Sequence, residues 1–245
     1  MNKNWDKVYI VGGGPGDPEL LTVKGERIIK EADLIVYANS LVTKDVVDIN
    51  KHAKKIESYG LTLRDIINII RDNFPEKKIV RIHSGDPSIY SSIFEETEKL
   101  KEYKIPFEII PGISSFLAAS ARLAREYTLP GVSQTLILTR AEGRTPVPSR
   151  ESLKSLAIHK TSMVLFLSAR HAKKVQEELL TSYPSDTPVV IAYRISREDE
   201  KFIFTRLSAL SQKIEEEKIE KTALILVGEF LDPPEHIRSY LYSKK

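Results

Sequence analysis

Short apolar runs rich in β-branched residues recur along the chain, and stretches with helical spacing separate most of them. Nine of these runs have the length and composition of β-strands: 8–11, 34–37, 79–83, 107–110, 135–139, 163–168, 189–193, 201–205 and 223–228. The helical spacing is clearest between Thr62, a candidate N-cap, and Pro75, which ends the stretch. Its apolar face consists of Leu63, Ile66, Ile67, Ile70 and Phe74. Strands that alternate with amphipathic helices predict an α/β fold.

The two halves of the chain differ in how their predicted strands are connected. In the first half, helical stretches join the strands, which favours a mostly parallel sheet. In the second half, only the charged segment 194–200 separates the runs 189–193 and 201–205, and it is too short for a crossover helix. We therefore expect two α/β domains: 1–112 with a mostly parallel sheet, and 113–245 with a mixed sheet that contains this hairpin.

A glycine-rich turn follows the first predicted strand, with the sequence Gly12-Gly13-Gly14-Pro15-Gly16-Asp17-Pro18, and a helix is expected from Glu19. The turn does not match the dinucleotide-binding fingerprint G-x-G-x-x-G, because Asp17 stands where the last glycine is required. No G-K-[ST] sequence occurs, which excludes a Walker A loop. Two interpretations remain: a loop that lets a ligand approach the backbone closely, or a plain turn between a strand and a helix.

Two further loops follow predicted strands at their carboxyl ends, where open α/β sheets bind ligands. The first is Ser84-Gly85-Asp86-Pro87, and the second is Pro111-Gly112-Ile113-Ser114-Ser115. Phe116 occupies the position of the last glycine in the nucleophile-elbow pattern G-x-S-x-G, so a serine hydrolase is not indicated. Ser114 and Ser115 either contact a ligand or cap the helix that follows.

Composition narrows the class of function. The 245-residue chain has no cysteine, which excludes disulfides, thiolate catalysis and iron–sulfur clusters and makes a cytoplasmic location the default expectation. None of its five histidines lies three or four residues from another, so we expect no bound metal. The net charge of +3 is nearly balanced, and the longest apolar runs, such as 163–167, are far shorter than a membrane span. We therefore expect neither a nucleic-acid partner nor a membrane.

Together, the three loops resemble the signatures of the tetrapyrrole methylase family of S-adenosylmethionine-dependent enzymes, in their order and spacing. Residues 8–22 are similar to the first signature, Gly85-Asp86-Pro87 with Tyr90 to the second, and residues 111–115 to the third. The visible departure is Gly13, where alanine is common in the family. Since both residues are small, this departure does little to weaken the resemblance.

Two stretches, 135–148 and 37–42, resemble one subgroup of this family, the precorrin-4 and cobalt-precorrin-4 C(11)-methyltransferases of cobalamin biosynthesis. The resemblance implies methyl transfer from S-adenosylmethionine to carbon 11 of the acceptor, and leaves open whether that acceptor contains cobalt. Two alternatives also remain open. One is another tetrapyrrole methylase, or a ribosomal RNA methylase, of the same fold; the other is a non-catalytic module that binds S-adenosylmethionine.

The resemblance also implies a donor pocket between the two domains. From the first domain it is expected to include Pro15, Ser84, Gly85, Asp86, Ile89, Ser114 and Ser115. From the second domain, the residues expected to line its adenine side are Leu167, Ala192, Tyr193, Ala223 and Leu224. The sulfonium methyl of this donor is already electrophilic, so we expect no obligatory general base and assign Asp86 a positioning role.

The acceptor and the assembly follow from the same resemblance. A precorrin carries several carboxylates, which arginine recognises bidentately. Arg140 and Arg144 lie in the subgroup loop, where Pro146 and Pro148 restrict the backbone, and we expect both arginines to bind the acceptor. A homodimer is also implied, with these apolar candidates for its interface: Ile237, Tyr240 and Leu241.

Overall fold

The computed structural model describes residues 5–233 of the chain. The chain divides into two compact units after Ala118. Helix α5 (Ser115–Leu123) spans this division, a few residues after the boundary expected at Gly112. The interface candidates Ile237, Tyr240 and Leu241 lie outside the described residues.

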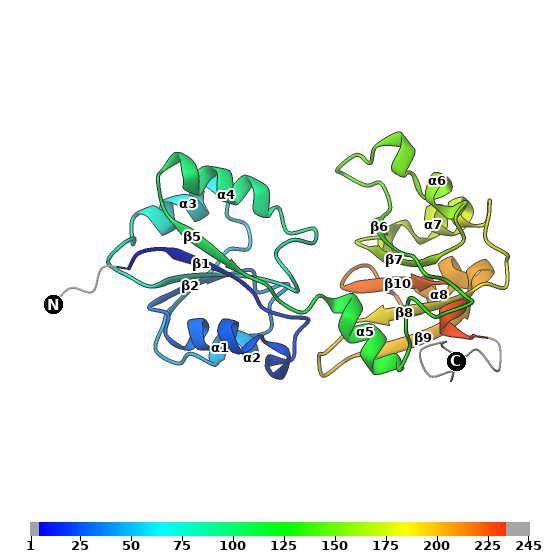
Figure 1. Ribbon diagram of the computed structural model, residues 1–245, viewed down its shortest axis with the longest axis horizontal. Coiled ribbons are helices and arrows are strands. Elements are labelled where there is room, and N and C mark those ends of the chain that lie inside the picture. Colours follow the sequence, from blue (N-terminus) through cyan, green and yellow to red (C-terminus); the bar gives the residue numbers. More distant parts are fainter. Residues whose placement is uncertain (1–4, 234–245) are drawn as a thin grey trace, which may run out of the picture. The chain divides into compact units, whose positions relative to one another are not determined.

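The first unit is a five-stranded sheet with helices on both faces (Figure 1). Its strands are β1 (Val8–Gly12), β2 (Leu34–Tyr37), β3 (Lys54–Glu57), β4 (Ile79–His83) and β5 (Phe107–Ile110), in the order β3-β2-β4-β1-β5. The short helix η1 (Pro18–Leu20) and the helices α1 (Val23–Lys30), α2 (Lys44–Asp48), α3 (Leu63–Arg71) and α4 (Ile93–Glu102) complete the unit. All neighbouring strands are parallel, which confirms the parallel sheet expected in the first half.

The two faces of this sheet pack against different helices, because side chains alternate along each strand. One face packs against α1 and α2, and its core includes Val11, Ile29, Ile35, Val46 and Ile82. The other face packs against α3 and α4, and its core includes Ile10, Leu34, Val36, Ile67 and Leu100. Full burial of an aliphatic side chain of this size stabilises the fold by about 1.5–3 kcal/mol. The two cores therefore hold the sheet between two helical layers.

Helix α3 confirms the clearest prediction from the helical spacing. Thr62 is its N-cap, and its side chain accepts a hydrogen bond from the backbone N–H of Asp65 while the Asp65 carboxylate accepts from the backbone N–H of Thr62. This reciprocal capping box satisfies two N–H groups that have no partner within a helix. Ile66, Ile67 and Ile70 are buried against the sheet.

Two elements of the first unit differ from expectation. Strand β3 was not predicted, because it is an edge strand with the sequence Lys-Lys-Ile-Glu, and its charged residues hide the apolar alternation. Helix α1 begins at Val23 rather than at Glu19, since the Thr22 side chain caps it by accepting the N–H of Gly25. The residues before it form the short helix η1, capped by Asp17.

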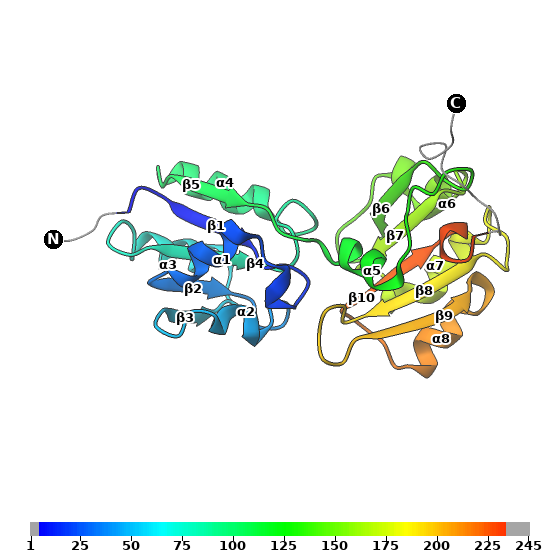
Figure 2. The same ribbon diagram turned by 60° about the horizontal axis from the view of Figure 1, so that its bottom comes forward.

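The second unit contains a mixed five-stranded sheet in the order β6-β7-β10-β8-β9 (Figure 2). Its strands are β6 (Leu136–Arg140), β7 (Ser162–Phe166), β8 (Pro188–Tyr193), β9 (Lys201–Arg206) and β10 (Ala223–Val227). Strands β6 and β7 are parallel, and β10 is antiparallel to both β7 and β8. Strands β8 and β9 form the predicted antiparallel hairpin. The mixed sheet expected in the second half is confirmed.

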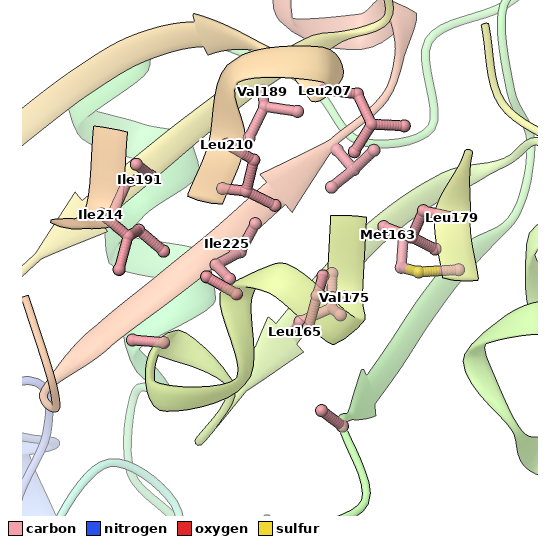
Figure 3. Packing of buried hydrophobic residues seen from close by; sticks show 14 of the residues in the cluster. Met163, Leu165, Val175, Leu179, Val189, Ile191, Leu207, Leu210, Ile214 and Ile225 are labelled. Carbon is pink, nitrogen blue, oxygen red and sulfur yellow. The ribbon is translucent and has the colours of Figure 1, made fainter. Parts of the chain in front are cut away.

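Helices α6 (Leu153–Ala157), α7 (Ala172–Leu179) and α8 (Leu210–Glu216) contribute to one core on this sheet. Figure 3 shows α7 and α8 side chains directed toward the strands, with Val175 and Leu210 near Leu165 and Ile225. Short helices connect the elements: η2 (Ser149–Glu151), η3 (Ala169–His171), η4 (Leu207–Ala209) and η5 (Glu229–Leu231). Within residues 5–233, no helix has both the length and the apolar character needed to cross a membrane.

Candidate active site

Strands β1 and β4 are neighbours, but the chain leaves them toward opposite faces of the sheet. Residues after β1 lead to α1 on one face, and residues after β4 lead to α4 on the other. Such a switch point opens a crevice at the carboxyl ends of the strands, where open α/β sheets bind their ligands. The glycine-rich turn and the Ser84-Gly85-Asp86-Pro87 loop both begin at this point.

Backbone hydrogen bonds join these two loops. The N–H of Gly13 donates to the carbonyl of His83 at 2.7 Å, which extends the pairing of β1 with β4. Beyond it, Gly85 donates to Gly14 at 2.7 Å and Gly14 donates to Gly85 at 3.2 Å. Gly85 has φ +65°, a left-handed conformation that favours glycine. The two loops therefore form one hydrogen-bonded structure rather than two independent turns.

The third loop approaches the first two so closely that no side chain fits between them. A Cβ atom on Gly112 would lie 2.3 Å from the carbonyl oxygen of Gly85 and 2.8 Å from the Cα of Gly12. A Cβ atom on Gly12 would lie 2.5 Å from the N atom of Gly112. Contacts this short are not tolerated, so both positions require glycine for space alone. The three strand ends thus pack backbone against backbone and form a floor with no side chain between the loops.

Asp86 fixes the second loop to the third. One carboxylate oxygen accepts the N–H of Gly112 at 2.9 Å, and the other accepts the N–H of Ser88 at 2.8 Å and the hydroxyl of Ser88. Partial burial opposes ionisation of Asp86, but these hydrogen bonds outweigh it and hold the pKa of the carboxyl below its usual value. An ionised carboxylate with both oxygens hydrogen-bonded in this way holds the backbone of Ser88 and Gly112 in place.

The loop 84–92, hereafter the β4 loop, joins β4 to α4. Its second half has an unusual backbone. Tyr90 and Ser92 have φ of 51° and 58°, in the left-handed region that residues other than glycine rarely adopt. Ser92 is also the N-cap of α4, without a side-chain capping hydrogen bond. Such residues persist where the surrounding structure holds them, and they occur often at ligand sites. Ile89 lies within this loop, and its N–H donates to the carbonyl of Asp86 at 3.2 Å.

The remaining expected residues of the first unit lie on the same loops. Pro15 is in the glycine-rich turn. Ser114 directly precedes α5 and its carbonyl accepts the N–H of Leu117 at 3.0 Å, while Ser115 is the first residue of that helix. Their position fits a helix cap and a ligand contact equally well. All seven expected residues therefore lie on the three loops after β1, β4 and β5 or at the start of α5.

Four of the residues expected in the second unit are cross-strand neighbours. Ala192 pairs with Leu224, and Tyr193 pairs with Ala223, at adjacent ends of β8 and β10. Leu167 directly follows β7, is 68% exposed and has φ 53°. A left-handed backbone is rare for leucine. A large apolar side chain with this backbone that is also exposed makes Leu167 an unusual position, of the kind often found at ligand sites.

The subgroup loop follows β6 and is closed by its own first arginine. The guanidinium of Arg140 donates to the carbonyls of Thr145 at 3.0 Å and Pro146 at 3.1 Å. The N–H of Ala141 donates to the buried hydroxyl of Ser168 at 2.8 Å, which attaches the start of the loop to the end of β7. Arg144 is exposed on this loop, and no hydrogen bond or ion pair joins it to another residue within 5–233. These contacts show that Arg140 closes the loop on itself, while Arg144 is exposed on its surface.

One group near the site was missed from sequence. Glu96 of α4 is buried beside Arg81 and His83 of β4. The available signal was its position in α4, between the apolar positions Ile93 and Leu100 and next to the buried Thr97. A charged residue on the buried face of a helix requires a partner, and only the strand order shows which one.

The switch point of the parallel sheet indicates a ligand-binding α/β protein, and the comparisons with known proteins identify its class. The chain matches the family Tetrapyrrole (Corrin/Porphyrin) Methylases over residues 7–211 and belongs to this family. A cobalt-precorrin-4 C(11)-methyltransferase of Methanocaldococcus jannaschii is 48% identical over 241 residues, covering 97% of this chain and 93% of that protein.

Two solved structures extend the comparison. The X-ray structure of a cobalamin biosynthetic enzyme, cobalt precorrin-4 methyltransferase, matches with a TM-score of 0.89 at 43% identity, covering 93% of this chain and 96% of that one. The uroporphyrin-III C-methyl transferase from Thermus thermophilus, solved in complex with S-adenyl homocysteine, matches with a TM-score of 0.78 at 26% identity, covering 92% of this chain and 98% of that one. The family, the fold and the methyltransferase class of this chain are thereby established.

Proposed function

We propose that this chain transfers a methyl group from S-adenosylmethionine to carbon 11 of cobalt-precorrin-4 in cobalamin biosynthesis. The observation that carries the methyl-donor site is the convergence of Gly12, Gly85 and Gly112 at the switch point of the parallel sheet. The acceptor is supported by 48% identity over nearly the full chain to a cobalt-precorrin-4 C(11)-methyltransferase.

We place the donor at this floor because open α/β sheets bind ligands at the carboxyl ends of their strands, which is where the three loops meet. In the first unit the residues that would hold the donor are Pro15, Ser84, Gly85, Asp86, Ile89, Ser114 and Ser115. In the second unit they are Leu167, Ala192, Tyr193, Ala223 and Leu224. When bound, S-adenosylmethionine supplies an electrophilic sulfonium methyl group.

The residues of the chain then act by orientation. Holding two reactants in a productive geometry lowers a barrier by about 7–11 kcal/mol in favourable cases. Asp86 contributes by fixing Gly112 and Ser88. It also remains ionised, because its pKa is depressed by those hydrogen bonds, and an ionised carboxylate with engaged oxygens is poorly suited to donate a proton. We assign it positioning and name no obligatory general base.

Acceptor recognition falls to the loop after β6. Arg140 holds the loop by its bonds to Thr145 and Pro146, and Arg144 presents a planar guanidinium that pairs bidentately with a carboxylate. A tetrapyrrole acceptor with several carboxylates provides the matching groups. Both arginines remain proposed acceptor-binding residues, and Arg140 also holds the loop in shape.

The direct test is a turnover assay with purified protein, methyl-labelled S-adenosylmethionine and cobalt-precorrin-4, read by mass spectrometry and by the position of the label. We expect one labelled methyl group at carbon 11. Metal-free precorrin-4 and uroporphyrinogen III serve as competing acceptors, and faster turnover of either one would overturn the assignment of the acceptor. Binding of S-adenosylhomocysteine without turnover of any acceptor would instead indicate a non-catalytic module.

We further infer that the enzyme works in the cytoplasm as a homodimer, on a small molecule rather than on nucleic acid. The absence of cysteine from the sequence and the nearly balanced charge of +3 support the location and the choice of substrate. Light scattering at micromolar concentration tests the assembly, and a monomer there would contradict the homodimer. Salt-sensitive binding of ribosomal RNA would contradict the choice of substrate.

A further inference from the structure

A cluster of three ionisable side chains lies beneath the β4 loop, on the face of the sheet that packs against α3 and α4. A carboxylate oxygen of Glu96 lies 3.4 Å from Nε of Arg81 and 3.3 Å from Nε2 of His83. The three side chains are only 5%, 10% and 7% exposed for Glu96, Arg81 and His83. Arg81 also donates to the hydroxyl of Ser58 at 3.0 Å and to the carbonyl of Val36 at 3.4 Å.

The cluster is a weak device for stability alone. Its Glu96 contacts are long, and Nε2 of His83 lies near Glu96 without the geometry of a hydrogen bond. Both this nitrogen and the other carboxylate oxygen of Glu96 are buried with no hydrogen-bond partner among the described residues. Buried ion pairs often stabilise a fold no better than apolar residues of the same size, because both charges lose their hydration. Buried ion pairs can instead provide specificity, because charged partners fix the relative position of the elements that carry them.

The elements that this cluster connects are the two ends of the β4 loop. His83 is the last residue of β4, and its own carbonyl accepts the N–H of Gly13 in the glycine-rich turn at 2.7 Å. Glu96 lies in the first turns of α4, just after the left-handed residues Tyr90 and Ser92. A loop with such a backbone keeps its shape only if both of its ends are held. The Glu96 contacts hold the end at α4 against the end at β4.

We propose that Arg81, His83 and Glu96 form a positioning cluster that sets the geometry of the loop 84–92 and thereby the affinity for the methyl donor. The cluster touches neither reactant: it acts through the backbone of His83 and through the start of α4. This inference rests on the proposed function, because it takes the loop 84–92 as part of the donor site.

Glu96→Gln tests the cluster, since it keeps the shape of the side chain and removes its charge. The matched control is Glu31→Gln at the opposite end of β4, where Glu31 pairs with Nζ of Lys78, a side chain only 4% exposed. Each variant takes a carboxylate away from a buried cation next to the same strand. We expect both to lower the melting temperature.

The two variants should differ in donor binding, measured by calorimetry with S-adenosylhomocysteine at a temperature well below both melting transitions. For Glu96→Gln we expect the Kd to rise by about tenfold, with kcat at saturating donor changed by less than about threefold. For Glu31→Gln we expect a Kd within about twofold of the parent. An unchanged Kd in Glu96→Gln, an equal rise in both variants, or a loss confined to kcat would each overturn the proposal.

If Glu96→Gln does not fold, His83→Leu decides by the same measurement. It leaves the Arg81–Glu96 pair intact and removes the contact between Glu96 and the imidazole, while the backbone carbonyl of residue 83 can still accept the N–H of Gly13. We expect the Kd to rise by about threefold or more, and an unchanged Kd would overturn the proposal. Donor binding by the unmodified protein distinguishes failure of the proposed function from failure of the positioning cluster. Failure of the parent to bind S-adenosylhomocysteine contradicts the proposed function, whereas tight binding by both the parent and the cluster variants contradicts only the cluster.

Discussion

The carboxylate of Asp86 accepts the backbone N–H of Gly112 at 2.9 Å and so joins the loops after β4 and β5, the two strands that flank β1. The turn after β1 is enclosed between these loops by contacts of glycine backbone. A hydrogen bond to a charged acceptor is stronger than one between neutral groups. One side chain therefore stabilises the arrangement of all three loops.

Replacement of Asp86 is expected to weaken donor binding while the fold survives. Asp86→Asn keeps the size of the side chain but loses the charge, so we expect the Kd for S-adenosylhomocysteine to rise by about tenfold, and more for Asp86→Ala. The control is Asp65→Asn, which removes a comparable capping carboxylate from the start of α3. Calorimetry measures both, and unchanged binding and turnover in Asp86→Ala would mean that the pocket lies elsewhere.

Gly112→Ala should disrupt the backbone floor by steric overlap, because its Cβ would lie 2.3 Å from the carbonyl oxygen of Gly85. Overpacking of this kind destabilises a protein by about 1–3 kcal/mol, and here it also separates the loops. We expect loss of measurable donor binding together with a lower melting temperature. Gly60→Ala is the control: it strains a backbone with φ +84° but has open space for a Cβ, so donor binding should persist. Tight donor binding by Gly112→Ala would show that the floor is not part of the site.

Arg144→Ala should impair use of the acceptor and leave the affinity for the donor unchanged. Loss of a charge-assisted pair to an acceptor carboxylate predicts a fall in kcat/KM by about tenfold to a hundredfold. Lysine at 144 should recover only part of this, because an ammonium group cannot form the bidentate pair. The control is Arg150→Ala, a nearby arginine that is highly exposed and pairs with Glu151. Unchanged acceptor kinetics would make Arg144 a solvated surface residue, and loss of donor binding would place the loop in the donor site.

The melting temperature should depend on pH in the acid range because the Glu96 carboxylate is ionised in the folded protein. Burial opposes ionisation of Glu96, but the contacts with His83 and Arg81 outweigh it and hold the pKa of the carboxyl below its usual value. A carboxylate with a depressed folded-state pKa contributes stability above its unfolded pKa, about 4.3 for glutamate, and loses it as pH falls through the lower folded value. The difference in melting temperature between parent and Glu96→Gln should therefore shrink as pH falls below about pH 4. A difference that stays constant down to about pH 3 would contradict it.

The position of the three loops could be predicted because its signals are local. Gly12 ends the first strand, Gly85, Asp86 and Gly112 follow strands that the apolar runs identify, and carboxyl ends of parallel strands meet at one edge of a sheet. The hydrogen bonds of Arg140 were harder to anticipate. Its bonds to the carbonyls of its own loop depend on how that loop folds back, and the amino-acid sequence of residues 141–148 does not specify this.

The sequence by itself determined the α/β class, the parallel and mixed sheets, the hairpin between β8 and β9 and the three loops, because the spacing of apolar residues and glycines is a property of neighbouring positions. Only the tertiary structure decided the strand order, the edge strand β3 and the pairing of Glu96 with Arg81 and His83. These depend on contacts between residues far apart in the chain. Their energies come from burial and charge in the assembled fold, and no local pattern records them.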